Sequence, residues 1–199
     1  MKDNGKGRAR FTPISFVNLA GWPLALKLEC ESSSDSNIRS RTIIPEIEAQ
    51  VPGVASIIMP LGNGKMLRAA AQYRQKHHRS WKIIAVEPEF YEPSWLRLIP
   101  GPRIDTASVE IQQAPCHLVG RIRVSDASTV LASRWLLRMG YFLGASSCAV
   151  LAAASYLINK QRLPLGIAVL VMTDQGDQYR STLYNDDWLL KRGFSITTP

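Results

Sequence analysis

The stretch IAVLVMTDQGDQYRST, from Ile167 to Thr182, begins with six apolar residues and ends in a polar segment that contains one glycine. A short and wholly apolar run is typical of a central parallel strand, because helices cover both faces of such a strand. Upstream of it, short β-rich runs alternate with longer helical patterns. The sequence therefore predicts an α/β fold of three layers, in which helices cover a parallel sheet.

The other elements are predicted from local patterns of apolar residues, turns and caps. Ser125 and Asp126 suit the start of a helix, and Gly140 suits its end. Pro45 would confine the first helix to a short piece or stand in its first turn. The segment Pro88–Pro115 contains five prolines and is expected to form a long ordered loop. Strands are predicted at Ile14–Leu19, Leu24–Glu29, Ala55–Met59, Ile83–Val86 and Leu118–Val124, and helices at Thr42–Gln50, Lys65–His77, Ala127–Met139, Ser146–Asn159 and Asp186–Lys191.

Length and composition favour one substantial core. A chain of 199 residues with 46% apolar content predicts a single α/β domain over residues 11–199, after a disordered basic tail of residues 1–10. No apolar run of membrane-spanning length and no secretory signal is evident, so we expect a cytoplasmic protein without a membrane partner. Cys30, Cys116 and Cys148 are odd in number and widely spaced, which favours free thiols over a disulfide framework or a metal site.

Two polar segments carry a specific resemblance. GASSCA (Gly144–Ala149) opens a long apolar helix, and DQGDQYRST (Asp174–Thr182) follows the apolar strand. In order and spacing they resemble the GxSSGA and DSGERYLST segments of the cysteine synthase and cystathionine β-synthase family, which are fold-type II pyridoxal phosphate enzymes. KIIAVEP (Lys82–Pro88) is similar to the family's central VGVEP strand, and LKLE (Leu26–Glu29) to the strand before its Schiff-base lysine. The resemblance spans Thr12–Phe194 and implies the large-domain fold of the family, which is like that of tryptophan synthase β.

The resemblance breaks after the LKLE strand. In the family this strand leads into an NPxGSxKDR sequence that carries the lysine, and then into a small domain. Here the strand is followed by Cys30 and then ESSSDSNIRSRT, which places Arg39 or Ile38 at the lysine position. Neither side chain can form an aldimine with pyridoxal phosphate. PEIEAQVPGVASIIMPLGNGKML (Pro45–Leu67) is already similar to the segment before the family's glycine loop, so the small domain is expected to be deleted near residues 32–45.

Candidate binding residues lie in the glycine turn and after the apolar strand. Gly62, Asn63, Gly64 and Lys65 form a candidate residual phosphate loop, because backbone amides and a helix N-terminus after a strand can hold a phosphate. Two glycines in such a turn are also common for steric reasons alone. Lys65 is the alternative aldimine lysine, but the resemblance implies that its amine meets the phosphate. The further candidates are Asp174, which could pair with a protonated ring nitrogen, and Ser146 and Ser147, which could line a ligand site but are favoured as helix N-cap residues.

The leading functional hypothesis is a non-catalytic relative of cysteine synthase that acts as a binding or regulatory subunit. We expect no catalytic residue, no metal ligand and no bound cofactor; pyridoxal phosphate, if bound, would form no internal aldimine. The family resemblance implies a homodimer, or a heteromer with a full-length active homologue. The second hypothesis is a pyridoxal phosphate-dependent β-replacement or β-elimination enzyme of cysteine metabolism that borrows a lysine from a partner chain.

The third hypothesis rests on charge. The net charge is +8, and no acidic residue occurs between Glu48 and Glu87. A basic stretch of this kind attracts phosphate, nucleic acid or the acidic face of a partner, although a solvated helix face would look the same. The expected anion or nucleic-acid site therefore runs from Lys65 to Lys82, with basic residues at Lys65, Arg68, Arg74, Lys76, Arg79 and Lys82.

Overall fold

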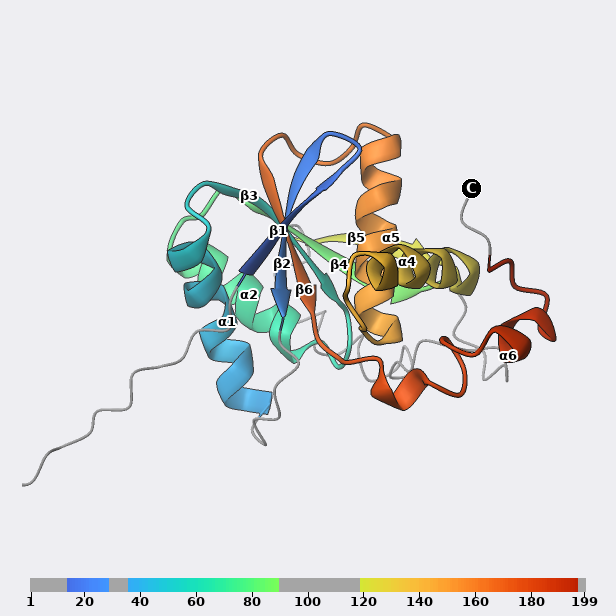
Figure 1. Ribbon diagram of the computed structural model, residues 1–199. Coiled ribbons are helices and arrows are strands. Elements are labelled where there is room, and N and C mark those ends of the chain that lie inside the picture. The colour runs from blue at the N-terminus through green and yellow to red at the C-terminus, as the bar shows by residue number, and fades with distance from the viewer. Residues whose placement is uncertain (1–13, 29–35, 90–118, 197–199) are drawn as a thin grey trace, which may run out of the picture.

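The computed structural model describes residues 14–28, 36–89 and 119–196. Six strands form one sheet in the order β1-β2-β6-β3-β4-β5 (Figure 1). All neighbouring strands are parallel except β1 and β2, which form an antiparallel hairpin at the edge. The strands are β1 (Ile14–Leu19), β2 (Trp22–Leu28), β3 (Val54–Pro60), β4 (Lys82–Pro88), β5 (Val119–Val124) and β6 (Ile167–Met172).

Helices cover both faces of this sheet (Figure 1). α1 (Ser36–Gln50) and α2 (Lys65–Lys76) lie on one face, and α4 (Asp126–Arg138) and α5 (Ala145–Asn159) lie on the other. After β6 the chain forms a short 3-10 helix, η2 (Asp177–Tyr179), and then α6 (Asp186–Leu190). The predicted three-layer α/β architecture is therefore confirmed, with one antiparallel strand added to a parallel sheet.

The central strand separates two apolar cores. Ala168, Leu170 and Met172 of β6 pack with α4 and α5, whereas Val169 and Val171 pack with α1 and α2. This alternation follows from the period of two along a strand. All five residues are fully buried, which explains why the sequence of β6 is uninterrupted by polar residues.

The hairpin departs from the predicted all-parallel sheet because its turn is too short for a crossover. Only Ala20 and Gly21 separate β1 from β2, and a two-residue connection can join only antiparallel strands. Gly21 has φ +85°, and its N–H donates to Asn18 Oδ1 at 2.9 Å. A glycine tolerates this left-handed conformation at no steric cost.

The prediction for Pro45 was wrong. α1 begins at Ser36, six residues before the predicted start, and Pro45 stands in the helix interior rather than in its first turn. The proline is exposed, while Ile43, Ile44 and Ile47 around it are buried in the core shared with α2. The free energy gained by burying these isoleucines offsets the cost of the backbone hydrogen bond that a proline removes from a helix. The other predicted strands and helices agree with the structure to within two residues at each described end.

Several predictions fall outside the described residues. They concern the basic tail, the serine run up to residue 35, nearly all of the proline-rich segment, Cys30 and Cys116. Cys148 is a buried free cysteine, as expected. Within residues 14–28, 36–89 and 119–196, no helix is both long enough and apolar enough to cross a bilayer.

Candidate functional site

The predicted site residues meet at one edge of the sheet. β2, β3 and β6 are parallel, so their carboxyl ends at Leu28, Pro60 and Met172 face the same way. Ligands of open α/β sheets bind outside this edge. The glycine turn follows β3 and Asp174 follows β6, so both lie there, near the end of β2.

The predicted phosphate loop partly satisfies its own backbone amides. Gly62 and Gly64 have φ +51° and +81°, and Gly64 precedes the first residue of α2. The Gly64 N–H donates to Leu61 O at 2.9 Å, and the Lys65 N–H donates to Asn63 Oδ1 at 3.1 Å. These bonds use two of the amides that would otherwise face a phosphate. In the described turn, the amides of Gly62 and Asn63 and the next amides of α2, at residues 66 and 67, remain for an anion.

Asp174 lies in a closed network at the start of α5. Its Oδ1 accepts from the Ser147 N–H at 3.3 Å and from the Ser147 hydroxyl at 2.8 Å, and its Oδ2 accepts from the Tyr179 hydroxyl at 2.9 Å. A Cβ added to Gly144 would lie 2.1 Å from Asp174 Oδ2, so only glycine fits beside this carboxylate. The carboxylate thus faces the N-terminus of α5, which favours negative charge.

The two serines of GASSCA do not cap α5 as predicted. The N-cap residue is Gly144, which makes no side-chain capping bond. Ser147 is fully buried in the first turn of the helix, and its hydroxyl also accepts from the Thr173 N–H at 3.1 Å. It therefore links α5 to the end of β6, a contact that a local N-cap rule could not predict.

Buried hydroxyl and thiol groups surround this network. Burial, and then the negative charge of Asp174, raise the pKa of Tyr179, so its hydroxyl stays protonated and donates to the carboxylate. Burial raises the pKa of Cys148 to about 12, so this thiol is not a nucleophile at neutral pH. Tyr184, whose pKa burial also raises, donates to the Leu143 carbonyl. The region around Asp174 is thus held together by hydrogen bonds that are already satisfied.

Sequence reasoning missed a buried ion pair at the same edge. Lys27 of β2 is fully buried, and its Nζ lies 2.9 Å from Glu46 Oε2 of α1. In the sheet register, Lys27 lies beside Val171 of β6. Val171 is two residues before Thr173. The only local signal was a lysine inside the apolar run of β2. The pair joins β2 directly to α1.

The comparisons with known proteins agree with this fold. Residues 30–174 match the sequence model of the family described as pyridoxal-phosphate dependent enzyme. The chain belongs to this family. It is 29% identical over 155 residues to an N-(2-amino-2-carboxyethyl)-L-glutamate synthase of Cupriavidus metallidurans, over 73% of this chain and 45% of that protein. It is 23% identical over 171 residues to a putative cysteine synthase of Sinorhizobium fredii, over 81% of this chain and 50% of that protein.

Solved structures show the same fold. A lysine-to-alanine mutant of O-ureido-L-serine synthase, with O-ureido-L-serine bound, superposes with a TM-score of 0.62 at 17% identity, covering 83% of this chain and 56% of that one. O-ureido-L-serine synthase without that mutation gives a TM-score of 0.61 at 18% identity, covering 78% of this chain and 53% of that one. The chain spans about half the length of the relatives that it matches.

The described residues fit only one end of pyridoxal phosphate. The start of α2 offers two amides and the amine of Lys65 to the phosphate. The aldehyde end has no suitable lysine, since the sequence has none from Leu28 to Gly64 and Lys27 is buried against Glu46. At the ring-nitrogen end, both oxygens of Asp174 already accept hydrogen bonds. A phosphate group fits this edge better than the whole cofactor does.

The predicted basic stretch does not form one patch. α2 starts at the carboxyl edge and has twelve residues, a length of about 18 Å. β4 then starts at the opposite, amino edge, so Lys65 and Lys82 lie at opposite edges of the sheet. Of this stretch, Lys76, Arg79 and Lys82 are exposed at the amino edge. Within the described residues no cluster of three or more potential metal ligands occurs.

At the amino edge, Glu48 is the centre of a second network. Its carboxylate accepts from the Tyr73 hydroxyl at 3.0 Å, from Arg79 Nη2 at 3.0 Å and from Trp81 Nε1 at 2.9 Å. Arg79 Nε lies 2.9 Å from its other oxygen, so the guanidinium binds with two nitrogens. Burial acts to raise the pKa of Glu48, but hydrogen bonds from Trp81, Tyr73 and Arg79 outweigh it and lower the pKa.

This lowered pKa predicts a pH-dependent contribution to stability. A carboxylate with a lowered pKa stabilises the folded state above its unfolded value of 4.5, and the contribution is lost as the pH falls through the folded pKa. Glu48→Gln should therefore lower the free energy of unfolding by about 2 kcal/mol at neutral pH, and by less below pH 4.5. Urea unfolding of both proteins at the two pH values measures this difference; a deficit that is independent of pH would contradict it.

Proposed function

We propose that this chain is a non-catalytic member of the family that serves as a binding or regulatory subunit. The observation that carries the proposal is the direct connection of β2 to α1. Seven residues, 29–35, separate the two elements, far fewer than the 50 or so that a domain needs. Lys27 and Glu46 join the same two elements through their side chains. This short connection supports the proposal that the small domain, which the family resemblance places after β2, is missing there.

The chemistry of the described residues supports the same proposal. A lysine that reacts with an aldehyde must be able to lose its proton at an accessible site. Lys27 is fully buried and ion-paired, and Lys65 is the first residue of α2, at the predicted phosphate loop. Loss of a small domain would also remove one wall of the site that orients a substrate and excludes water. A role in binding follows more directly than a role in turnover.

We propose that the partner is a second copy of this chain or a full-length active homologue. Six large apolar side chains are more than 40% exposed in the described part of the chain, so apolar surface is available for a partner to cover. The dimer contacts implied by the family resemblance would use the large-domain fold that this chain retains. The exposed side chains are Phe16, Leu137, Met139, Tyr156, Leu165 and Leu190.

Native mass spectrometry after co-expression with an active family member tests this subunit role. We expect a species that contains two chains. It should persist on dilution to about 1 μM, which requires a dissociation constant at or below that concentration. Leu137→Glu and Leu165→Glu each place a charge on the exposed surface. The variant whose charge becomes buried under the partner should dissociate the complex, which identifies the face that the partner covers. A monomer at all concentrations, with and without the homologue, would refute the subunit role.

A further inference from the structure

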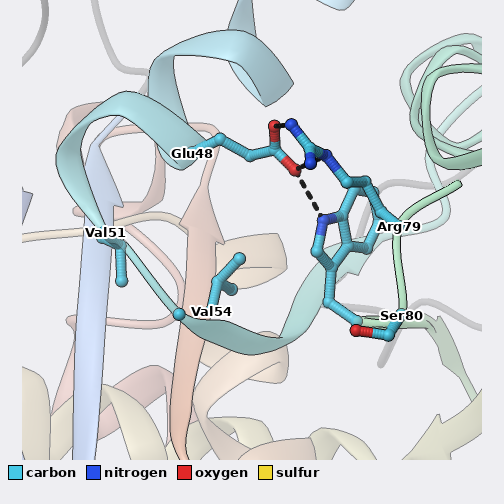
Figure 2. A pocket seen from close by; sticks show the side chains of 7 residues that line it. Glu48, Val51, Val54, Arg79 and Ser80 are labelled. Carbon is cyan, nitrogen blue, oxygen red and sulfur yellow. Dashed lines mark hydrogen bonds and ion pairs between the residues drawn. The ribbon is translucent and has the colours of Figure 1, made fainter. Parts of the chain in front are cut away.

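A pocket of about 270 Å³ opens at the amino edge of the sheet, between the end of α1 and the start of β4 (Figure 2). It lies at the opposite edge from the glycine turn and Asp174, so it is separate from the site that the family resemblance predicts. Small-molecule pockets in proteins span about 300–1,000 Å³. A pocket of this size suits a compact ligand.

One side of the pocket presents hydrogen-bond donors that are already held in place. Arg79 is fixed against Glu48 through Nε and Nη2 and also hydrogen-bonds Tyr73, which leaves Nη1 for a ligand. About 46% of the Arg79 side chain is exposed. The neighbouring Ser80 is exposed, and it lines the pocket beside Arg79. A ligand would meet these donors at little further cost in side-chain entropy.

The charge around the pocket favours an anion. Glu48 contributes the negative charge of the pocket, but each of its oxygens already accepts two hydrogen bonds, and Arg79 balances its charge. Lys76 and Lys82 are exposed at the same edge, and no acidic residue lies between Glu48 and Glu87 in the sequence. A cationic ligand would find no free acceptor on Glu48 and would be repelled by this surplus of positive charge.

The other side of the pocket is apolar. Val51 and Val54 line it, on the far side from Arg79 and Ser80 in Figure 2. Gly53 lies between them with φ +79° and has no side chain to fill the space. Trp81 is almost fully buried, and its indole N–H is already bonded to Glu48, so it adds a wall rather than a donor. An apolar body therefore fits between the valines and the polar side.

We propose that this pocket binds a small monocarboxylate with a compact apolar body. The carboxylate accepts from the Nη1 N–H groups of Arg79 and from the Ser80 hydroxyl, in charge-assisted hydrogen bonds. The body lies against Val51 and Val54. The proposal does not depend on whether the chain is catalytic, because none of these residues lies at the carboxyl edge.

The test compares benzoate with benzamide, which has almost the same shape but no charge. Each is titrated into the full chain at constant ionic strength, and NMR follows the indole N–H of Trp81 and the backbone amide of Ser80. We expect benzoate to bind with a dissociation constant of about 1 mM. Benzamide should bind at least about tenfold more weakly, because it cannot pair with the guanidinium charge.

Two matched variants locate the site. Ser80→Glu adds a negative charge to the pocket, whereas Gln75→Glu adds the same charge at an exposed position near the end of α2, outside the pocket. Benzoate affinity should fall at least about tenfold in the first and change less than about twofold in the second. Equal binding of benzoate and benzamide, equal effects of the two variants, or no benzoate shift up to about 50 mM would overturn the proposal.

Discussion

Lys27→Met is expected to lower the free energy of unfolding by about 3 kcal/mol. The methionine keeps the apolar length of the side chain but removes the ammonium group 2.9 Å from Glu46 Oε2. Glu46 is only 19% exposed in its side chain, so its carboxylate would be left largely buried without its cation. Chemical unfolding of the wild type and the variant at neutral pH measures the difference.

Lys82→Met is the matched control, because Lys82 lies in β4 of the same sheet but is exposed. It should change stability by less than about 0.5 kcal/mol. Lys27→Met combined with Glu46→Leu should recover at least half of the loss, since it removes both charges. Equal stability of the Lys27→Met and Lys82→Met proteins would show that the pair does not hold β2 against α1.

Asp174→Ala is expected to cost about 3 kcal/mol as well, for a different reason. Its carboxylate accepts from the Ser147 N–H, the Ser147 hydroxyl and the Tyr179 hydroxyl, and removing it leaves buried donors without a partner. Each unsatisfied buried group costs about 1–3 kcal/mol. Thermal and urea unfolding should both report the loss.

Asp177→Ala is the control for this variant. Asp177 lies three residues further on, and its carboxylate pairs with Arg180 on the surface, where the two side chains are 60% and 69% exposed. Such exposed pairs contribute at most about 1 kcal/mol. If Asp174→Ala lowers the free energy of unfolding no more than Asp177→Ala does, then the Asp174 carboxylate is available to bind a ligand. Its fit to a ring nitrogen must then be reconsidered.

The fold could be predicted because its determinants are local. The uninterrupted apolar run of β6, the apolar face of α2 and the caps around α4 each involve residues close together in the sequence. Ser125 caps α4 through the Ser128 N–H, as its residue type predicts. Pro45 failed as a helix boundary because burial of the surrounding isoleucines, a tertiary effect, outweighed a local preference.

The side-chain networks could not be predicted in the same way. Lys27 contacts Glu46 across 19 residues, Ser147 contacts Asp174 across 27, and Trp81 contacts Glu48 across 33. No local period relates such partners, which only the sheet order brings together. Asp174 was predicted as a binding residue after the apolar strand, but the sequence could not reveal that hydrogen bonds already occupy its oxygens.

Reduction of the pyridoxal phosphate-treated protein with borohydride tests the central claim most directly. The protein is incubated with an excess of cofactor, reduced, and analysed by intact-mass and peptide mass spectrometry, with an active family member as the positive control. We expect no stoichiometric phosphopyridoxyl group on Lys27 or Lys65, and no visible aldimine absorbance before reduction. One cofactor reduced onto a single lysine of this chain, with loss of that absorbance, would contradict a non-catalytic role.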